Sequence, residues 1–284
     1  MGKTEQKKYS KEIEAIVENM SLMDDDLMAR VFDENIPATQ RLLRTILSRD
    51  VEVIEAKGQW DLKNPLVEGR NIRLDVFAKD VDGTYFDCEV QRKSSGASPR
   101  RVRFHSAMLD ARMLESGKEF NEINDSYVIF ITESDYYREN EPIYNVKRFV
   151  NGKKQFEDGN HIVYVNGAYE SDDALGRLLK DMKNKDVTGF YNEELEKGVR
   201  QFKDDKEGKN IMCEAVENYA EQYAAGKYDS GKSEGKIEGK IEGKIEGKIE
   251  AIRALMKNLK LSAEQAMESI GIPKSEYNKY MSKL

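Results

Sequence analysis

Two short segments, Ile72-Arg73-Leu74-Asp75-Val76-Phe77 and Phe86-Asp87-Cys88-Glu89-Val90-Gln91-Arg92, lie on either side of Asp80-Val81-Asp82-Gly83. In both segments apolar and polar residues alternate, as in strands with one buried face, and the stretch between them is typical of a hairpin turn. In the first strand Ile72, Leu74 and Val76 are expected to share the apolar face. The sequence therefore predicts a β-hairpin that presents a carboxylate on each strand, Asp75 on the first and Glu89 on the second.

The length of the turn decides whether the two carboxylates meet, because a slip of one residue moves every side chain to the other face. A two-residue Asp82-Gly83 loop sets Asp75 opposite Val90. A three-residue loop, with Gly83 left-handed as a bulge residue, sets Asp75 opposite Glu89 instead. In that register the two Cβ atoms lie about 4.5–5.5 Å apart, where like charges are destabilising unless something neutralises them. A divalent cation that prefers oxygen ligands, such as Mg²⁺ or Mn²⁺, would do so.

Acidic residues at alternate strand positions also form ordinary solvated sheet faces, and that alternative applies to any isolated hairpin. Here the acids belong to a longer pattern. Asp75 followed by Glu89-Val90-Gln91 resembles the metal-binding core of the PD-(D/E)XK nucleases, in the transposase-like or recombination-promoting branch where glutamine stands in the lysine position. The resemblance covers about residues 20–185, and it extends through Asn64–Arg70, Gly96–His105, Tyr127–Glu133 and Ile162–Tyr169.

This resemblance implies a metal-dependent DNA endonuclease, a hydrolase of phosphodiester bonds with a transposase-like or recombination-promoting role and with Mg²⁺ or Mn²⁺ as cofactor. It implies that Asp75 and Glu89 hold the metal and that the backbone carbonyl of Val90 supplies a third oxygen. Gln91 is the third catalytic candidate. Its neutral amide can orient water but supplies no positive charge, which leaves that task to the metal or to nearby arginines.

A basic stretch follows the second strand directly. The whole chain has a net charge of −7, but residues 92–112 carry a local net charge of plus five. Cations beside a metal site are what phosphate contacts require, although a solvated helix face is the alternative. The candidate DNA-binding residues are Lys93, Arg100, Arg101, Arg103 and His105.

Some cores of the family also take an acidic metal ligand from the first helix, and Glu34 is the candidate for that ligand here. The triplet Asp24-Asp25-Asp26 is interpreted instead as an acidic first turn that complements a helix dipole.

The expected elements follow the order helix, three strands, helix, strand. Asn35 caps a helix that starts near Pro37, residues 51–56 form a first strand, and the hairpin strands follow. Pro99 opens a helix over about 101–115. The inward side chains of that helix are expected to be Phe104, Ala107, Met108, Ala111 and Leu114. The continuous apolar run 127–132 predicts a strand that is buried from both sides.

This order predicts an α/β fold with a restriction-endonuclease-like αβββαβ core, in which a mixed central sheet is flanked by helices, plus an α-helical C-terminal extension. A further strand at 161–165 and a helix at 173–182 are expected after the core. We expect a nuclease-like domain at 1–185, a helical cover at 186–230, a helical spacer at 231–250 and a small helical module at 251–284.

The spacer contains Gly-Lys-Ile-Glu four times in succession, at 235–250. Its four glycines weaken a helix by about 1 kcal/mol each relative to alanine. The repeat is either a spacer that pairs with a second copy of the chain or a repeat expansion with little function. The last module is either a helix-turn-helix or an oligomerisation tail, so a homo-oligomer formed through the C-terminal helices is one expected partner.

The lack of long apolar runs and the few cysteines and histidines limit the location and the kinds of site that we expect. No run approaches the roughly 18 apolar residues of a membrane helix, and the N-terminus shows no apolar signal core, so we expect a cytoplasmic protein with DNA, and no membrane, as partner. Cys88 and Cys213 are expected to be buried unpaired thiols, and His105 and His161 are too few for a zinc centre. Two rivals remain: a catalytically idle nuclease fold that binds DNA or regulates, suggested by Gln91, and an interaction protein that oligomerises through the repeat.

Overall fold

The computed structural model describes residues 9–64, 68–114 and 116–221, and then residues 249–250, 252–253, 256, 260, 262–273 and 277–281. The chain divides into two compact units, Met1–Glu217 and Asn218–Leu284. The Gly-Lys-Ile-Glu repeat up to position 248 lies outside the described residues, so the spacer and its pairing remain predictions.

Six strands form one mixed sheet in the first unit, in the order β1-β2-β3-β4-β8-β5. The β1–β2 and β2–β3 pairs are antiparallel, and the β3–β4 and β4–β8 pairs are parallel. Strand β5 runs antiparallel to β8 at the edge of the sheet. Their bounds are β1 Val53–Leu62, β2 Ile72–Asp80, β3 Tyr85–Gln91, β4 Ser126–Thr132, β5 Ile143–Val146 and β8 Asn160–Asn166. With helix α3 (Ile36–Leu47) before β1 and helix α4 (Pro99–Met113) between β3 and β4, the αβββαβ order is confirmed.

The hairpin between β2 and β3 uses the three-residue loop. Val76 pairs with Cys88 and Lys79 with Tyr85, a register that carries Asp80 to Thr84 and Asp75 to Glu89. Gly83 has φ +82°, and its amide donates to the Asp80 carbonyl at 3.1 Å. Glycine adopts this left-handed backbone without strain. The register that opposes the two carboxylates is therefore confirmed.

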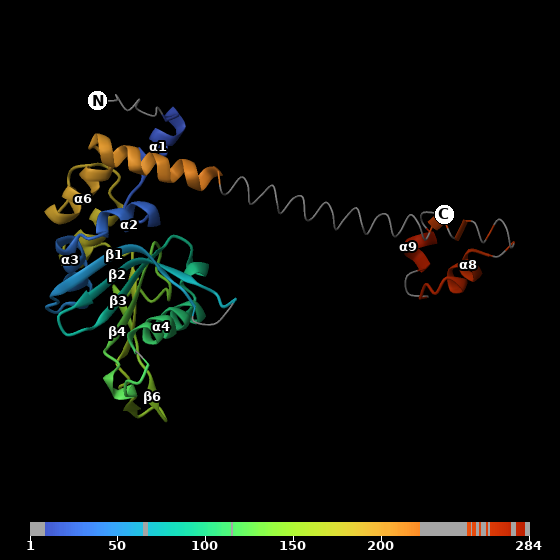
Figure 1. The fold of residues 1–284 in the computed structure, drawn as a ribbon, viewed down its shortest axis with the longest axis horizontal. Coiled ribbons are helices and arrows are strands. Elements are labelled where there is room, and N and C mark those ends of the chain that lie inside the picture. Colours follow the sequence, from blue (N-terminus) through green and yellow to red (C-terminus); the bar gives the residue numbers. More distant parts are fainter. Residues whose placement is uncertain are drawn as a thin grey trace. The chain divides into compact units, whose positions relative to one another are not determined.

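Helices cover both faces of the sheet (Figure 1). On one face the large core cluster joins the odd-numbered side chains of β4 and β8 to several helices. These helices are α1 (Lys11–Asn19), α2 (Asp25–Phe32), α3, α5 (Ala174–Lys183), α6 (Glu193–Lys203) and the helical residues 206–217. On the other face α4 packs over Phe77, Val128, Phe130 and Tyr164. Asn35 caps α3 by accepting from the Ala38 amide, as expected.

The inward face of α4 differs from the sequence expectation. Ala107 and Ala111 are exposed, whereas His105 and Ser106 are buried together with Val102, Met108 and Leu109. The apolar pattern gave the wrong phase because two of the side chains that face the sheet are polar. This phase brings His105 against the strand that carries Glu89.

The alternation of β2 breaks at Asp75, so the expectation that Ile72, Leu74 and Val76 share a face is wrong. Leu74 packs in the α4-side cluster, while Val76 packs in the opposite cluster. The β1–β2 ladder pairs Gly58 with Val76 and Trp60 with Leu74, and Gln59 between them has φ +47°. This local irregularity turns the Asp75 side chain toward β3 instead of placing it squarely on one face.

Smaller elements complete the first unit: η1 (Ser94–Ala97), η2 (Phe120–Glu122) and the short strands β6 (Phe149–Val150) and β7 (Lys154–Gln155). Both cysteines are free and buried, as expected. None of the helices that the structure describes is long and apolar enough to cross a membrane.

The second unit has a small apolar cluster of its own, which includes Ile252, Met267, Ile272 and Tyr280. Helix α8 (Ala263–Ser269) begins at Ser262, whose hydroxyl accepts from the Gln265 amide. It ends in a Schellman motif: Gly271, at φ +72°, donates to the Glu268 carbonyl, and Ile272 donates to the Met267 carbonyl. Helix α9 (Tyr277–Met281) follows. These contacts fit a compact turn between two short helices.

Candidate active site

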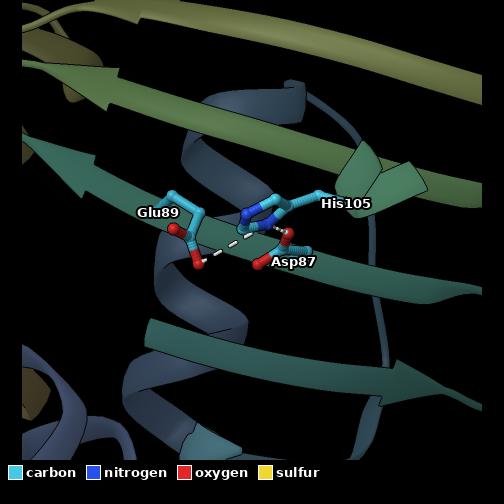
Figure 2. Close-up of side chains that lie close together, drawn as sticks. All are labelled: Asp87, Glu89 and His105. Carbon is cyan, nitrogen blue, oxygen red and sulfur yellow. Dashed lines mark hydrogen bonds and ion pairs between the residues drawn. The ribbon is translucent and has the colours of Figure 1, made fainter. Parts of the chain in front are cut away.

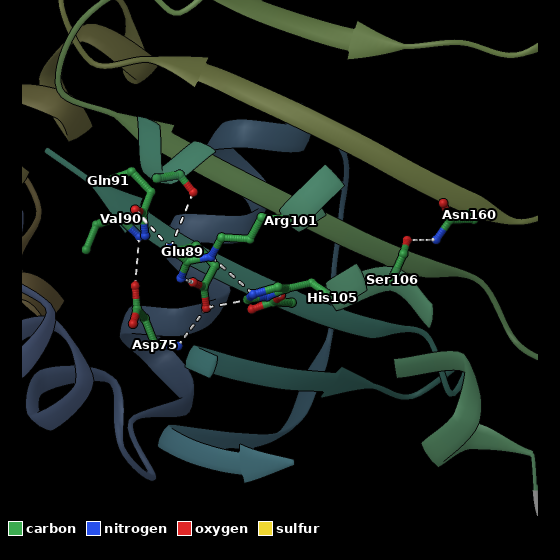
Figure 3. Close-up of polar contacts among 10 residues, drawn as sticks. Asp75, Glu89, Val90, Gln91, Arg101, His105, Ser106 and Asn160 are labelled. Carbon is green, nitrogen blue, oxygen red and sulfur yellow. Dashed lines mark hydrogen bonds and ion pairs between the residues drawn. The ribbon is translucent and has the colours of Figure 1, made fainter. Parts of the chain in front are cut away.

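The two predicted carboxylates meet where the β2–β3 ladder opens. At the next position, Asp75 and Glu89, the two strands are joined by hydrogen bonds from backbone amides to side-chain oxygens instead of by backbone pairing. The Asp75 amide donates to Glu89 Oε1 at 3.0 Å, and the Val90 amide donates to Asp75 Oδ2 at 3.0 Å (Figure 3). Each carboxylate is thus fixed through one oxygen by the opposite strand, and the two acids are held side by side.

Arg101 from the first turns of α4 supplies positive charge to this site. Its Nη2 donates to Glu89 Oε2 at 2.9 Å, and its Nη1 donates to Gln91 Oε1 at 3.3 Å (Figure 3). The η1 backbone packs tightly over Gln91, because a Cβ on Gly96 would lie 1.9 Å from Gln91 Oε1. The guanidinium therefore brings a cation to the amide that stands in the lysine position.

Two further side chains complete the buried part of the site. Asp87, two residues before Glu89 on β3, and His105 on α4 face each other, with His105 Nδ1 2.8 Å from Asp87 Oδ2 (Figure 2). The exposed fractions of Asp87 and Glu89 are 0%, and that of His105 is 2%. Asp87, Glu89 and His105 each offer one ligand atom within 4.8 Å of the others. Among the described residues, these three form the group whose side chains could together hold a metal ion.

Burial dominates the electrostatics of the three carboxyl groups. It raises the pKa of Asp75 to about 8, with repulsion from Glu89 as the next cause. It also raises the pKa of Glu89 to about 8, with repulsion from Asp87 adding to the rise, and it raises the pKa of Asp87 well above its usual value. Burial lowers the pKa of His105, which favours the neutral imidazole, while the charge of Glu89 opposes this shift. The site therefore holds protons at neutral pH unless a cation replaces them.

The acidic residues near the first helices bear on the metal ligand expected there. Glu34 is exposed between α2 and α3, and it lines a cavity with α6 residues such as Lys197 and Gly198, apart from the carboxylates. Asp25, in the first turn of α2, is instead close enough to raise the pKa of Asp75. Its neighbour Asp24 accepts from Arg92, at the end of β3, at 2.7 Å. Of these acids, Asp25 is the one whose charge reaches Asp75, and the ligand role expected for Glu34 stays a prediction.

The predicted DNA-binding residues do not share one surface. Arg100 and Arg101 line a cavity of about 730 Å³ together with Arg70 and Arg73, and His105 forms part of its wall. Arg103 lines a different cavity of about 710 Å³, around Asn160. Lys93 is exposed next to η1. His105 is buried against Asp87 and Glu89. A direct contact between His105 and DNA is therefore not expected, and the residue belongs with the carboxylates.

The sequence interpretation missed Asp87 and the pairing of His105. Asp87 was visible as a carboxylate two residues from Glu89, hence on the same face of β3. His105 was visible four residues after Arg101, hence on the same face of α4. The contact was missed because the predicted inward face included Ala107 and Ala111, which are exposed, and left out the polar His105, although its Met108 is buried as expected.

A mixed sheet with α4 on one face and the paired carboxylates at the opening of β2 and β3 places the chain in the restriction-endonuclease-like class. The sequence model of the family described as PD-(D/E)XK nuclease family transposase matches residues 29–172, about half of the chain. The chain belongs to this family, which supports a nuclease or transposase-like function. No curated protein and no solved structure matches the chain.

Proposed function

We propose that the protein is a metal-dependent DNA endonuclease that hydrolyses phosphodiester bonds at the Asp75–Glu89 pair. The observation that carries the proposal is the opposition of these two carboxylates, each fixed through one oxygen by the other strand. Two buried acids side by side are costly without a cation, and oxygen donors suit Mg²⁺ or Mn²⁺. The orphaned buried oxygen of Asp87 beside them also fits a cation-binding site.

Asp75, Glu89 and the backbone carbonyl of Val90 would hold the cation, with Asp25 close by at the start of α2. When bound, the cation polarises a phosphoryl oxygen and activates a water for in-line attack. Hydrolysis joins the water oxygen to phosphorus and breaks the bond to the leaving oxygen, which takes up a proton.

Arg101 would do the work that lysine does in most relatives of this nuclease class. Its guanidinium lies against both Glu89 and Gln91, so it can stabilise negative charge that develops on the phosphate. Gln91, fixed by Arg101 and Gly96, would orient the water. This supply of charge favours an active site over the catalytically idle fold.

The cavity lined by four arginines gives the DNA strand a path to the site. Arg70, Arg73 and Arg100 lie around it with Arg101. Arginine matches phosphate geometry through paired hydrogen bonds, and the repeated phosphates of a strand reward several such contacts. Double-strand cutting with one such site per chain requires two copies or two events, and pairing through the C-terminal helices is our proposal for the former.

The test is cleavage of a supercoiled plasmid by the full chain with Mg²⁺, Mn²⁺, Ca²⁺ or a chelator. We expect nicking with Mg²⁺ or Mn²⁺ and a loss of about 10³-fold or more in Asp75→Asn and Glu89→Gln, since each removes several kcal/mol of transition-state stabilisation. Asp82→Asn is the matched control, because Asp82 is an exposed carboxylate in the turn of the same hairpin. Cleavage that survives in Asp75→Asn, or a folded wild type that never cuts, would overturn the proposal.

A further inference from the structure

The buried group Asp87, Glu89 and His105 lies next to the Asp75–Glu89 pair but is not explained by it. Glu89 belongs to both groups, whereas Asp87 and His105 have no task in the proposed cleavage. The three side chains come from two elements, β3 and α4, and their ligand atoms lie within 4.8 Å of one another.

The spacing fits a single bound ion. His105 Nδ1 lies 2.8 Å from Asp87 Oδ2 and 3.9 Å from Glu89 Oε1. Donors on a cation with metal–ligand bonds of about 2.1 Å are separated by about 3.0 Å at right angles and about 3.4 Å in a tetrahedron. Because no two of the three donors lie more than 4.8 Å apart, shifts of up to about 1 Å would bring all three to one ion.

An unpartnered atom in the same group also supports a bound cation. Asp87 Oδ1 is the buried side-chain oxygen that lacks a hydrogen-bond partner among the residues the structure describes. Asp87 is fully buried, and a buried carboxylate oxygen without a donor costs about 1–3 kcal/mol or more. A proton shared between Asp87 and Glu89 would relieve this cost, and so would a cation. With a shared proton His105 keeps its own proton on Nδ1, whereas a cation would bind Nδ1 in place of that proton.

The hydrogen bonds of His105 assign its present tautomer. Arg101 Nε donates to His105 Nε2 at 3.3 Å, so Nε2 accepts and Nδ1 carries the proton that it donates to Asp87. An ion at Nδ1 displaces that proton to solvent, and Nε2 takes up a proton to keep the ring neutral. The bond from Arg101 to Nε2 is then lost. Occupancy of this site would release Arg101 from His105 while leaving its bond to Glu89.

The donor set also selects the ion. Mg²⁺ prefers oxygen ligands alone, whereas imidazole is a ligand of transition-metal ions such as Zn²⁺, Fe²⁺ and Ni²⁺. Among the transition-metal ions, Mn²⁺ is the one that prefers carboxylate oxygens, so a set of two carboxylates and one imidazole suits it. His105 forms part of the wall of the arginine-lined cavity, which gives an ion a route to the group.

We propose that Asp87, Glu89 and His105 form a second cation site, selective for a transition-metal ion such as Mn²⁺ over Mg²⁺, next to the Asp75–Glu89 site. The inference rests on the proposed function only in sharing Glu89 with it, and it requires no DNA cleavage.

The test is pulsed electron paramagnetic resonance of the full chain loaded with Mn²⁺, because an imidazole ligand produces a nitrogen hyperfine coupling that oxygen ligands cannot. We expect this coupling and two bound Mn²⁺ ions per chain in the wild type. His105→Gln should lose the coupling and weaken one Mn²⁺ by more than about tenfold, the loss that even outer partners of metal ligands cause. Asp87→Asn should weaken the same ion.

Two variants make the result specific. His161→Gln should keep the coupling, because His161 is the other histidine of the chain and pairs with Asp125 on the surface. Asp75→Asn should also keep the coupling while losing the other ion, so failure of the nuclease proposal and failure of the second site give different results. A wild type without nitrogen coupling, or a coupling that survives in His105→Gln, would overturn the second site.

Discussion

Helix α4 covers two polar clusters on the same face of the sheet, and they differ in one respect. Toward its N-terminus, Arg101 and His105 meet Asp87 and Glu89, where carboxylates are in excess and Asp87 Oδ1 has no donor. Further along, Ser106 and Asp110 meet Asn160 and Ser126. There the Ser126 hydroxyl donates to Asp110 at 3.3 Å, and Asn160 donates to both serines. We call these the acidic cluster and the serine cluster.

The comparison shows that burial of polar groups does not by itself mark a functional site. Burial raises the pKa of Asp110 just as it raises those of Asp87 and Glu89. The two clusters differ in whether their polar atoms find partners. The buried side-chain atoms of the serine cluster all have hydrogen-bond partners, whereas the acidic cluster sets two buried carboxylates against the single guanidinium of Arg101 and leaves Asp87 Oδ1 without a donor. An unpartnered buried carboxylate oxygen is expected in an empty cation site, whereas polar groups that only support the fold are hydrogen-bonded.

The largest expected difference is in cleavage. Arg101→Ala should lower plasmid cleavage by about 10²–10³-fold, the usual cost of one donor that stabilises transition-state charge. Arg148→Ala is the matched control, since Arg148 pairs with Asp158 and bonds to Asn160 beside the serine cluster. Equal losses in the two variants would remove the functional distinction between the clusters.

The second difference is in the pH dependence of stability without metal. The folded-state pKa values of Asp75 and Glu89 are raised to about 8 from ordinary values near 4. Their contribution to stability is therefore complete below about pH 4 and is lost as the pH rises to about 8. Thermal unfolding in chelator should show a falling Tm over this range, and Mn²⁺ should restore it. The curve should be flatter in Asp75→Asn, and an unchanged curve would contradict the raised pKa.

The third difference is in the effect of removing a polar group. Ser126→Ala deprives Asp110 and Asn160 of a partner and should cost about 1–3 kcal/mol of unfolding free energy without changing cleavage per folded molecule. Asp87→Asn keeps an oxygen for His105 and replaces the orphaned oxygen by a donor, so it should be neutral or stabilising in the absence of metal. Denaturant titration of both variants measures this, and a large loss in Asp87→Asn would show that the acidic cluster is already satisfied.

The smallest difference is in the salt dependence of DNA binding. Arg100 lines the cavity beside the acidic cluster, and Arg103 lines the one beside the serine cluster. Arg100→Ala should reduce the slope of log K against log salt by about 1, as expected for one lost phosphate contact, while Arg103→Ala should leave it unchanged. Binding titrations at several salt concentrations decide this. The opposite result would place the DNA along the serine cluster.

The sequence predicted Glu89 of the acidic cluster and Asp75 beside it, but it predicted no contact of the serine cluster. Asp75 and Glu89 were found because their meeting depends on one local turn, and a strand period of two carries that register along the hairpin. Ser126 and Asn160 gave no signal, since hydroxyl and amide groups occur at many surfaces and their pairing requires β4 and β8 to lie side by side. The sequence did not indicate that the charge of Asp25 reaches Asp75, because no local pattern encodes which end of α2 approaches β2.

The sequence by itself determined the αβββαβ order and the β-hairpin, limited the turn to two or three residues, and marked Asp75 and Glu89 as the carboxylates that a three-residue turn would oppose. These follow from interactions between residues close in the chain. Only the tertiary structure decided that the strand alternation breaks at Asp75, that α4 turns His105 inward, and that Arg101 reaches Glu89 and Gln91. Those contacts join separate elements, and the packing of α4 on the sheet fixes them because burying its apolar side chains outweighs the cost of burying His105 beside Asp87.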